Sequence, residues 1–107
     1  MKGRSIMKYF IVEGTFKENM SIKENELQKA IEEHLAFLQK GFDEGFILVS
    51  GPKVNVGGGI IIIKGQSLVD IENYLSKDPL KTLGIQEYKI VEFKLHDCQA
   101  MLKGWFD

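Results

Sequence analysis

His34 is the residue of this 107-residue chain whose type and position best suit chemistry. It comes three residues after Ile31 and four before Leu38, so it lies on or beside the apolar stripe of a predicted helix. A neutral imidazole titrates near working pH, and it can therefore accept a proton and return it as a general base. The alternative is a packed histidine satisfied by a backbone carbonyl, and position alone favours that alternative.

Few other side chains offer chemistry. His96, next to Asp97 at the predicted end of a strand, is expected to be solvated. Cys98 is the only cysteine, so the sequence predicts no internal disulfide and no metal site within one chain. The glycines at 57–59 lead into a strand and lack the Lys and helix that follow a phosphate-binding loop. They predict a hairpin loop instead.

The composition argues against several classes of partner. Fourteen basic and 15 acidic residues give a net charge of -1, which gives no electrostatic reason to predict nucleic-acid or membrane binding. No apolar run approaches the roughly 20 residues of a membrane span, and no signal-peptide core follows the basic start. A single cysteine suits a reducing compartment. We therefore expect one cytoplasmic domain over residues 1–107, with a loose leader at residues 1–6.

Periodicity predicts the order strand, helix, strand, strand, helix, strand. The strands are expected at Met7–Phe16, Phe46–Pro52, Gly59–Gly65 and Glu87–His96. The first helix should run from a capping box at Ser21 and Glu24 to a left-handed end at Gly45. The second should start at Ser67 and stop before Pro79. This order is that of an α+β fold, a ferredoxin-like β-α-β-β-α-β sandwich with both helices on one face of an antiparallel sheet.

Hydrophobic patterning predicts which side chains are buried. The first helix carries one apolar stripe: Leu27, Ile31, Leu35, Leu38 and Phe42. Gly41 inside that helix costs about 1 kcal/mol relative to Ala, and close packing on a neighbour would compensate. In the last strand, apolar and polar side chains alternate. The apolar side chains are expected to be buried: Val91, Phe93 and Leu95.

Four consecutive isoleucines, Ile60–Ile63, point alternately to both faces of their strand. The helices can cover only one of these faces, and a strand that is apolar on both faces is normally buried on both. A second copy of the chain, packed sheet against sheet, is the simplest cover and predicts a homodimer. The C-terminal tail, residues 97–107, carries Trp105 and Phe106 and can dock on its own domain or on a partner. We favour a dimer in which this tail helps to close a cavity.

Seven residues, in this order and spacing, carry a resemblance to a known family: His34, Asp43, Gly45, Gly51, Pro52, Asp78 and Pro79. Five of them belong to "HLAFLQKGFDEGFILVSGP" and two form a later "DP". The chain from about Met7 to Leu95 resembles the YciI-like family (YCII-related domain). The resemblance implies a dimeric α+β barrel of ferredoxin-like units. It also implies an active site built around a His and an Asp, here His34 and Asp78. One branch of similar proteins removes chloride from a chlorinated hydroxyhydroquinone without metal or organic cofactor.

The chain also departs from this family. Leu80 follows the "DP" pair where an aromatic residue is usual, and the aromatic-bearing tail to Asp107 is longer than in the shortest members. Both departures lie where they would change the shape of a pocket. The resemblance therefore does not identify the substrate.

Asp78 has two interpretations. Asp followed by Pro79 suits the start of a helical turn over "DPLKTL", with Asp as the cap and Pro at the first position. Under the resemblance, its carboxylate orients His34 and stabilises the imidazolium that forms. The two roles are expected to be compatible only if one carboxylate oxygen remains free. Gly51 and Pro52 are interpreted first as a turn, and under the resemblance as substrate-binding residues of the pocket lining.

The predicted function is that of a cofactor-free enzyme on a small organic substrate. His34 would move a proton next to a carbonyl or phenol, Asp78 would hold the imidazole, and amides near Gly51 would stabilise an oxyanion. Lyase-like elimination, such as dehalogenation, and isomerisation both need only these groups. The alternative is a non-catalytic small-molecule-binding or structural dimer module. A monooxygenase acting on an activated phenol is a third, weaker alternative.

Overall fold

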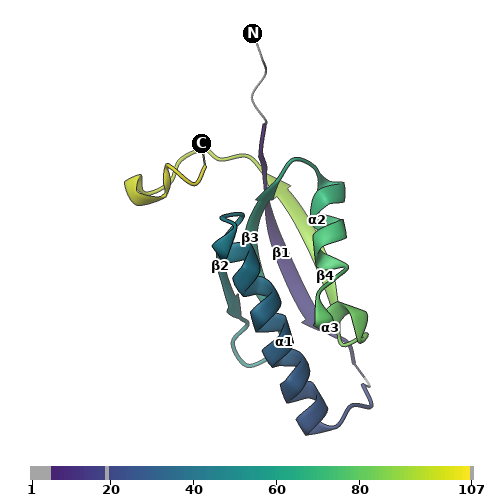
Figure 1. Ribbon diagram of the computed structural model, residues 1–107. Coiled ribbons are helices and arrows are strands. Elements are labelled where there is room, and N and C mark those ends of the chain that lie inside the picture. Colours follow the sequence, from purple (N-terminus) through teal and green to yellow (C-terminus); the bar gives the residue numbers. More distant parts are fainter. Residues whose placement is uncertain (1–5, 19, 107) are drawn as a thin grey trace.

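The computed structural model describes residues 6–18 and 20–106 (Figure 1). Of the predicted leader, only Ile6 falls within these residues, and the rest lies outside the described residues. The elements, in chain order, are β1 Lys8–Phe16, α1 Glu24–Asp43, β2 Ile47–Pro52, β3 Gly58–Gly65, α2 Leu68–Leu75, α3 Pro79–Thr82, β4 Gln86–Phe93 and a 3-10 helix at Ala100–Leu102. Among the helices described, none combines the length and apolar character that crossing a membrane requires.

The strands form one sheet with the order β2-β3-β1-β4, and every neighbouring pair is antiparallel. Figure 1 shows α1, α2 and the short α3 on the same face of this sheet, with α1 lying over β2 and β3. The predicted ferredoxin-like α+β architecture is therefore confirmed. The opposite face of the sheet, which none of the described helices covers, is called the open face below.

The core lies between the sheet and the helices. Its fully buried members are Phe10, Val12, Leu38, Ile47, Ile61, Ile63, Ile71 and Leu75. Ile61 and Ile63 point into this core, while Ile60, which is 37% exposed, points to the open face as the alternation predicts. Gly41 packs as closely as expected, because a β carbon there would lie 2.4 Å from Cδ1 of Ile47.

Three of the four predicted helix boundaries agree with the structure. Ser67 caps α2 by accepting a hydrogen bond from the Asp70 amide, and Gly45 follows α1 with a φ of 87°. The predicted cap at Ser21 is wrong, because α1 begins at Glu24. The Glu26 carboxylate accepts from the Lys23 amide at 3.3 Å, so the acidic side chain that closes the first turn comes two residues later than expected.

The buried face of β4 also differs from the prediction. Gln86 is buried and Tyr88 and Ile90 pack on the core, whereas Val91 is 47% exposed on the open face. Leu95 lies beyond the end of the strand. Side chains point alternately to the two faces of a strand. A prediction that assigns one residue to the wrong face therefore assigns every other residue of the strand to the wrong face too.

The described part of the tail docks on its own domain. The indole Nε1 of Trp105 donates to the Gly45 carbonyl at 2.9 Å, and the Lys64 ammonium lies 4.5 Å from the indole centroid. The Tyr9 hydroxyl donates to the carbonyl of Phe106, and the two rings pack edge to face. The tail therefore lies against the end of the sheet where β1 begins.

Candidate active site

The structure brings His34 and Asp78 together. His34 lies on α1, and its Nδ1 is 2.8 Å from Oδ2 and 2.9 Å from Oδ1 of Asp78. The imidazole side chain is 15% exposed and the carboxylate is completely buried. The two residues are 44 positions apart in the chain, and they meet because α1 packs against the short helix α3.

Asp78 sits at the junction between α2 and α3 because of the proline that follows it. Pro79 holds the first position of α3, and the Oδ1 of Asp78 accepts from the Leu80 amide at 2.9 Å, so the predicted cap is confirmed. The Tyr88 hydroxyl donates to Oδ2. The expectation that one oxygen must stay free is wrong, because each carboxylate oxygen has two lone pairs and can accept from two donors.

The hydrogen bonds around Asp78 decide the state of the imidazole. A buried carboxylate accepts hydrogen bonds, so the proton of a neutral His34 ring lies on Nδ1, and Nε2 then carries the lone pair. Among the described residues, Nε2 has no hydrogen-bond partner, and no fully buried side-chain nitrogen or oxygen lacks one. The Nε2 atom is therefore accessible and able to accept a proton.

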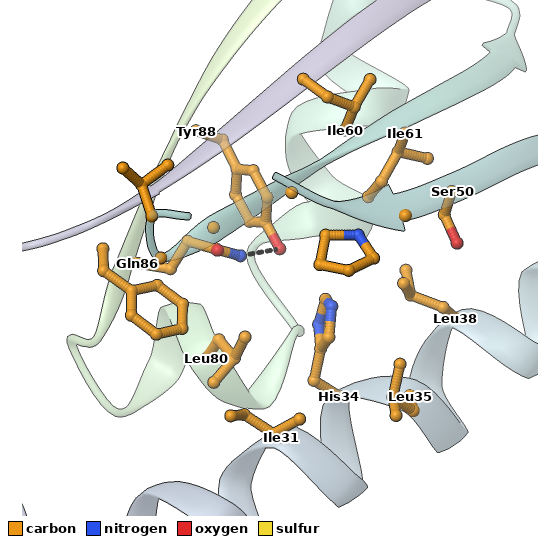
Figure 2. A pocket seen from close by; sticks show the side chains of 17 residues that line it. Ile31, His34, Leu35, Leu38, Ser50, Ile60, Ile61, Leu80, Gln86 and Tyr88 are labelled. Atoms are coloured by element: carbon orange, nitrogen blue, oxygen red, sulfur yellow. Dashed lines mark hydrogen bonds between the residues drawn. The ribbon is translucent and has the colours of Figure 1, made fainter. Parts of the chain in front are cut away.

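His34 faces a cavity of about 410 Å³ between α1 and the sheet (Figure 2). The walls are mostly apolar and include Phe16, Ile31, Leu35, Leu38, Val56, Ile61 and Leu80. Leu35, predicted to be part of the buried stripe, is exposed and lines this cavity. Polar side chains reach the lining at four positions: His34, Ser50, Gln86 and Tyr88. None of the lining residues within the described chain is Lys, Arg, Asp or Glu.

The predicted binding residues Gly51 and Pro52 also line the cavity, at the end of β2. Gly51 pairs with Ile60 of β3, and β2 is an edge strand, so alternate amides along it face away from the sheet. Pro52 has no amide proton and contributes only ring surface and a carbonyl. The hydroxyl of Ser50, which sequence analysis missed, is one further donor and has no partner among the described side chains and backbone groups.

Tyr88 and Gln86 are the other lining residues that sequence analysis missed. The Gln86 Nε2 donates to the Tyr88 hydroxyl at 2.9 Å (Figure 2), and that hydroxyl donates in turn to Asp78. Burial raises the pKa of the Tyr88 phenol above its ordinary range, and the Asp78 carboxylate raises it further. The correct register of β4 would have placed both side chains on the core face, beside His34.

Three further observations concern other residues of the chain. In residues 6–18 and 20–106, no three His, Cys, Asp or Glu side chains gather where they could hold a metal ion. Of the described tail residues, none lines the cavity within a single chain. Asp43, one of the residues that carry the resemblance, lies at the exposed end of α1, where its carboxylate accepts from the Gln39 amide at 2.9 Å.

Comparisons with known proteins agree with this architecture. A model of the YCII-related domain matches residues 7–94, which confirms the resemblance inferred from the sequence. Among curated protein sequences, none matches the chain. The 5-chloro-2-hydroxyhydroquinone dehydrochlorinase TftG of Burkholderia phenoliruptrix AC1100, solved with 2,5-dihydroxybenzoquinone, is similar in structure, with a TM-score of 0.63 and 19% identity over 80% of this chain and 93% of that chain. A conserved protein from Methanosarcina mazei Go1 is also similar, with a TM-score of 0.50 and 13% identity over 84% of this chain and 96% of that chain.

Proposed function

This chain belongs to the YCII-related domain family, and we propose that it is a cofactor-free enzyme in which His34 acts as a general base on a small organic substrate. One observation carries the proposal. A buried carboxylate, Asp78, holds Nδ1 of His34, while Nε2 is accessible beside an apolar cavity. This arrangement suits a base that removes a proton and becomes an imidazolium, because Asp78 stabilises the positive charge.

The lining of the cavity supports an uncharged small organic substrate. A volume of about 410 Å³ falls in the range of small-molecule pockets. A carboxylate or phosphate group would lose its hydration here without a cation to replace it, since no Lys or Arg belongs to the described lining. A phenol or a cyclic ketone would keep its apolar ring against the walls. The dihydroxybenzoquinone bound to TftG is a molecule of this size class.

The proposed reaction begins when Nε2 of His34 takes a proton from a hydroxyl group or from a carbon next to a carbonyl. The electron pair left behind forms a new double bond, and negative charge develops on the substrate oxygen. The Ser50 hydroxyl and the Gly51 amide, which belong to the lining of the same cavity, are the proposed donors that stabilise that charge. In an elimination, the leaving group, such as chloride, departs with its own electron pair. In an isomerisation, His34 returns the proton to another atom.

We also propose that a second copy of the chain covers the open face. Four side chains of this face are between 37% and 48% exposed: Ile11, Val49, Ile60 and Val91. The strand register places them together, because Ile11 pairs with Ile62 and with Val91 across the sheet. A contiguous apolar sheet face is rarely left in water, and two-fold packing of identical faces buries it in both copies.

The experiment that tests the function uses two probes and the wild-type protein. Chloride release from 5-chloro-2-hydroxyhydroquinone is followed with an ion-selective electrode, and deuterium uptake from D₂O by enolisable cyclic ketones is followed by NMR. Catalysed turnover in either assay supports the proposal. Stoichiometric binding of 2,5-dihydroxybenzoquinone with no turnover in both assays would contradict it, and would favour a binding module that uses the same cavity.

A further inference from the structure

Gly14 is unexpected inside β1, because glycine weakens the interior of a strand. It is buried on the core face and pairs with Tyr88 of β4. A β carbon at this position would lie 2.6 Å from Cδ and 2.8 Å from Oε1 of Gln86. The absence of a side chain at Gly14 therefore leaves the space in which the Gln86 carboxamide lies across β1.

The position of Gln86 directs the proton of the Tyr88 hydroxyl. The Gln86 amide donates to the Tyr88 oxygen at 2.9 Å, so that oxygen accepts on one side and must send its own proton elsewhere. Its proton goes to Oδ2 of Asp78, the same oxygen that lies 2.8 Å from Nδ1 of His34. A continuous series of contacts thus joins Gly14 to the imidazole.

The Tyr88 hydroxyl is not available as an acid or base for the substrate. Its oxygen accepts from Gln86 and its proton is donated to Asp78. Burial and the neighbouring carboxylate both raise the pKa of this phenol, so it keeps its proton throughout the working range of pH. Tyr74 is a useful contrast, because its hydroxyl lies 3.5 Å from the Phe37 carbonyl and makes no hydrogen bond to His34 or Asp78.

We propose that Gly14, Gln86 and Tyr88 form a positioning relay that fixes the Asp78 carboxylate and thereby keeps the proton of His34 on Nδ1. Tyr88 acts through Asp78 and is a positioning residue. The inference rests on the proposed function of His34 as a base, but the state of the imidazole can be measured without any turnover. A tyrosine that only fills space would be replaced by phenylalanine without consequence for that state.

The test uses protein labelled with ¹⁵N-histidine, in which NMR reports the protonation of both ring nitrogens and the exchange of the Nδ1 proton with water. In the wild type, we expect the His34 proton on Nδ1 and slow exchange. Tyr88→Phe keeps the ring and removes the hydroxyl, so exchange should become faster by at least about tenfold, with some proton shifted to Nε2. Gln86→Leu and Gly14→Ala, which disturb the relay farther from Asp78, should shift both quantities in the same direction.

Tyr74→Phe is the matched control and should leave both quantities at their wild-type values. Backbone amide exchange at Val12, in the core of β1, shows whether each variant is folded. Should Gly14→Ala fail to fold, Gln86→Leu tests the same contact. Wild-type exchange and tautomer in both folded Tyr88→Phe and folded Gln86→Leu would overturn the relay.

A second readout separates the relay from the proposed function. If the wild type releases chloride from 5-chloro-2-hydroxyhydroquinone, Tyr88→Phe should lower kcat by about ten- to a hundredfold and leave KM nearly unchanged, because its hydroxyl is already engaged away from the substrate. An equal loss of kcat/KM that came from a higher KM, with kcat unchanged, would contradict a positioning role. If the wild type shows no turnover, the proposed function fails while the NMR measurement still decides the relay.

Discussion

The Nδ1 atom of His34 lies 2.8 Å from the buried Oδ2 of Asp78, although the two residues are far apart in the sequence. Asp78 occupies this place because it caps α3 ahead of Pro79. One carboxylate therefore caps the start of α3 and holds an imidazole on another helix. Because its carboxylate is hydrogen-bonded to the Leu80 amide, the Asp78 side chain has little freedom to move. That rigidity suits a group proposed to keep a base in one orientation.

Replacement of Asp78 by Asn should remove most of the activity. An asparagine in this place carries no charge to stabilise an imidazolium, and its amide can favour the wrong tautomer of His34. We expect kcat to fall by roughly a hundred- to ten-thousandfold, as in other histidine–aspartate pairs. Initial rates of chloride release or deuterium uptake would measure the loss. A rate within a factor of two of the wild type would contradict the role assigned to Asp78.

Replacement of Asp78 by Ala should also destabilise the fold. The variant loses the cap of α3 and leaves the Leu80 amide and the Tyr88 hydroxyl without their acceptor. Together these losses should lower the free energy of unfolding by about 3 kcal/mol, measured by urea denaturation. Asp97→Ala is the control, because Asp97 is exposed and should change the stability by less than about 0.5 kcal/mol.

Ile11→Lys should convert the proposed dimer into a monomer. Ile11 is 38% exposed at the centre of the open face, so a lysine there is tolerated in one chain but not between two apolar sheets. Sedimentation equilibrium at several concentrations would measure the change in mass. Val69→Lys, on the exposed side of α2, should leave the mass unchanged. A wild-type protein that sediments as a monomer would remove the proposal of a sheet-to-sheet interface.

Stability should fall at alkaline pH because of two phenols. Burial raises the pKa of Tyr74 and of Tyr88 in the folded state, whereas both titrate near pH 10 in the unfolded chain. Above about pH 10 the unfolded state therefore binds fewer protons, so the free energy of unfolding decreases as the pH rises. Tyr88→Phe should reduce that dependence by about one proton. Urea titrations between about pH 10 and 12 would measure the slope of the free energy of unfolding against pH. Equal slopes for the variant and the wild type would show that folding does not raise the pKa of Tyr88.

Local signals in the sequence account for much of the fold. The caps at Ser67 and Asp78, the left-handed Gly45 and the alternation of Ile60–Ile63 each depend on a few neighbouring residues, and the structure contains all of them. The order of elements then leaves few arrangements of the chain. The start of α1 was missed because Ser21 and Glu24 have the spacing of a capping box, whereas the residue that precedes α1 is Lys23, which is not a usual helix cap.

The site was less accessible from the sequence. Periodicity placed His34 beside the apolar stripe, but only the family resemblance paired it with Asp78, because nothing local relates two positions so far apart. Tyr88 and Gln86 were missed because β4 carries apolar side chains on both of its faces. Which face is buried depends on how β4 pairs with β1, and that pairing is not visible in the sequence of β4 alone. Ser50 was missed because a lone hydroxyl on an edge strand has no distinctive pattern.

The most direct test of the account compares the two histidines. His34→Gln removes the proposed base from the cavity, and His96→Gln changes an exposed residue near the end of β4. With the wild type as reference, chloride release from 5-chloro-2-hydroxyhydroquinone and deuterium uptake by cyclic ketones are measured for both variants. We predict that the catalysed rate of His34→Gln is at least about a hundredfold lower than that of the wild type, and that His96→Gln has the wild-type rate. A folded His34→Gln protein that turns over either probe at the wild-type rate would contradict the assignment of His34 as the base.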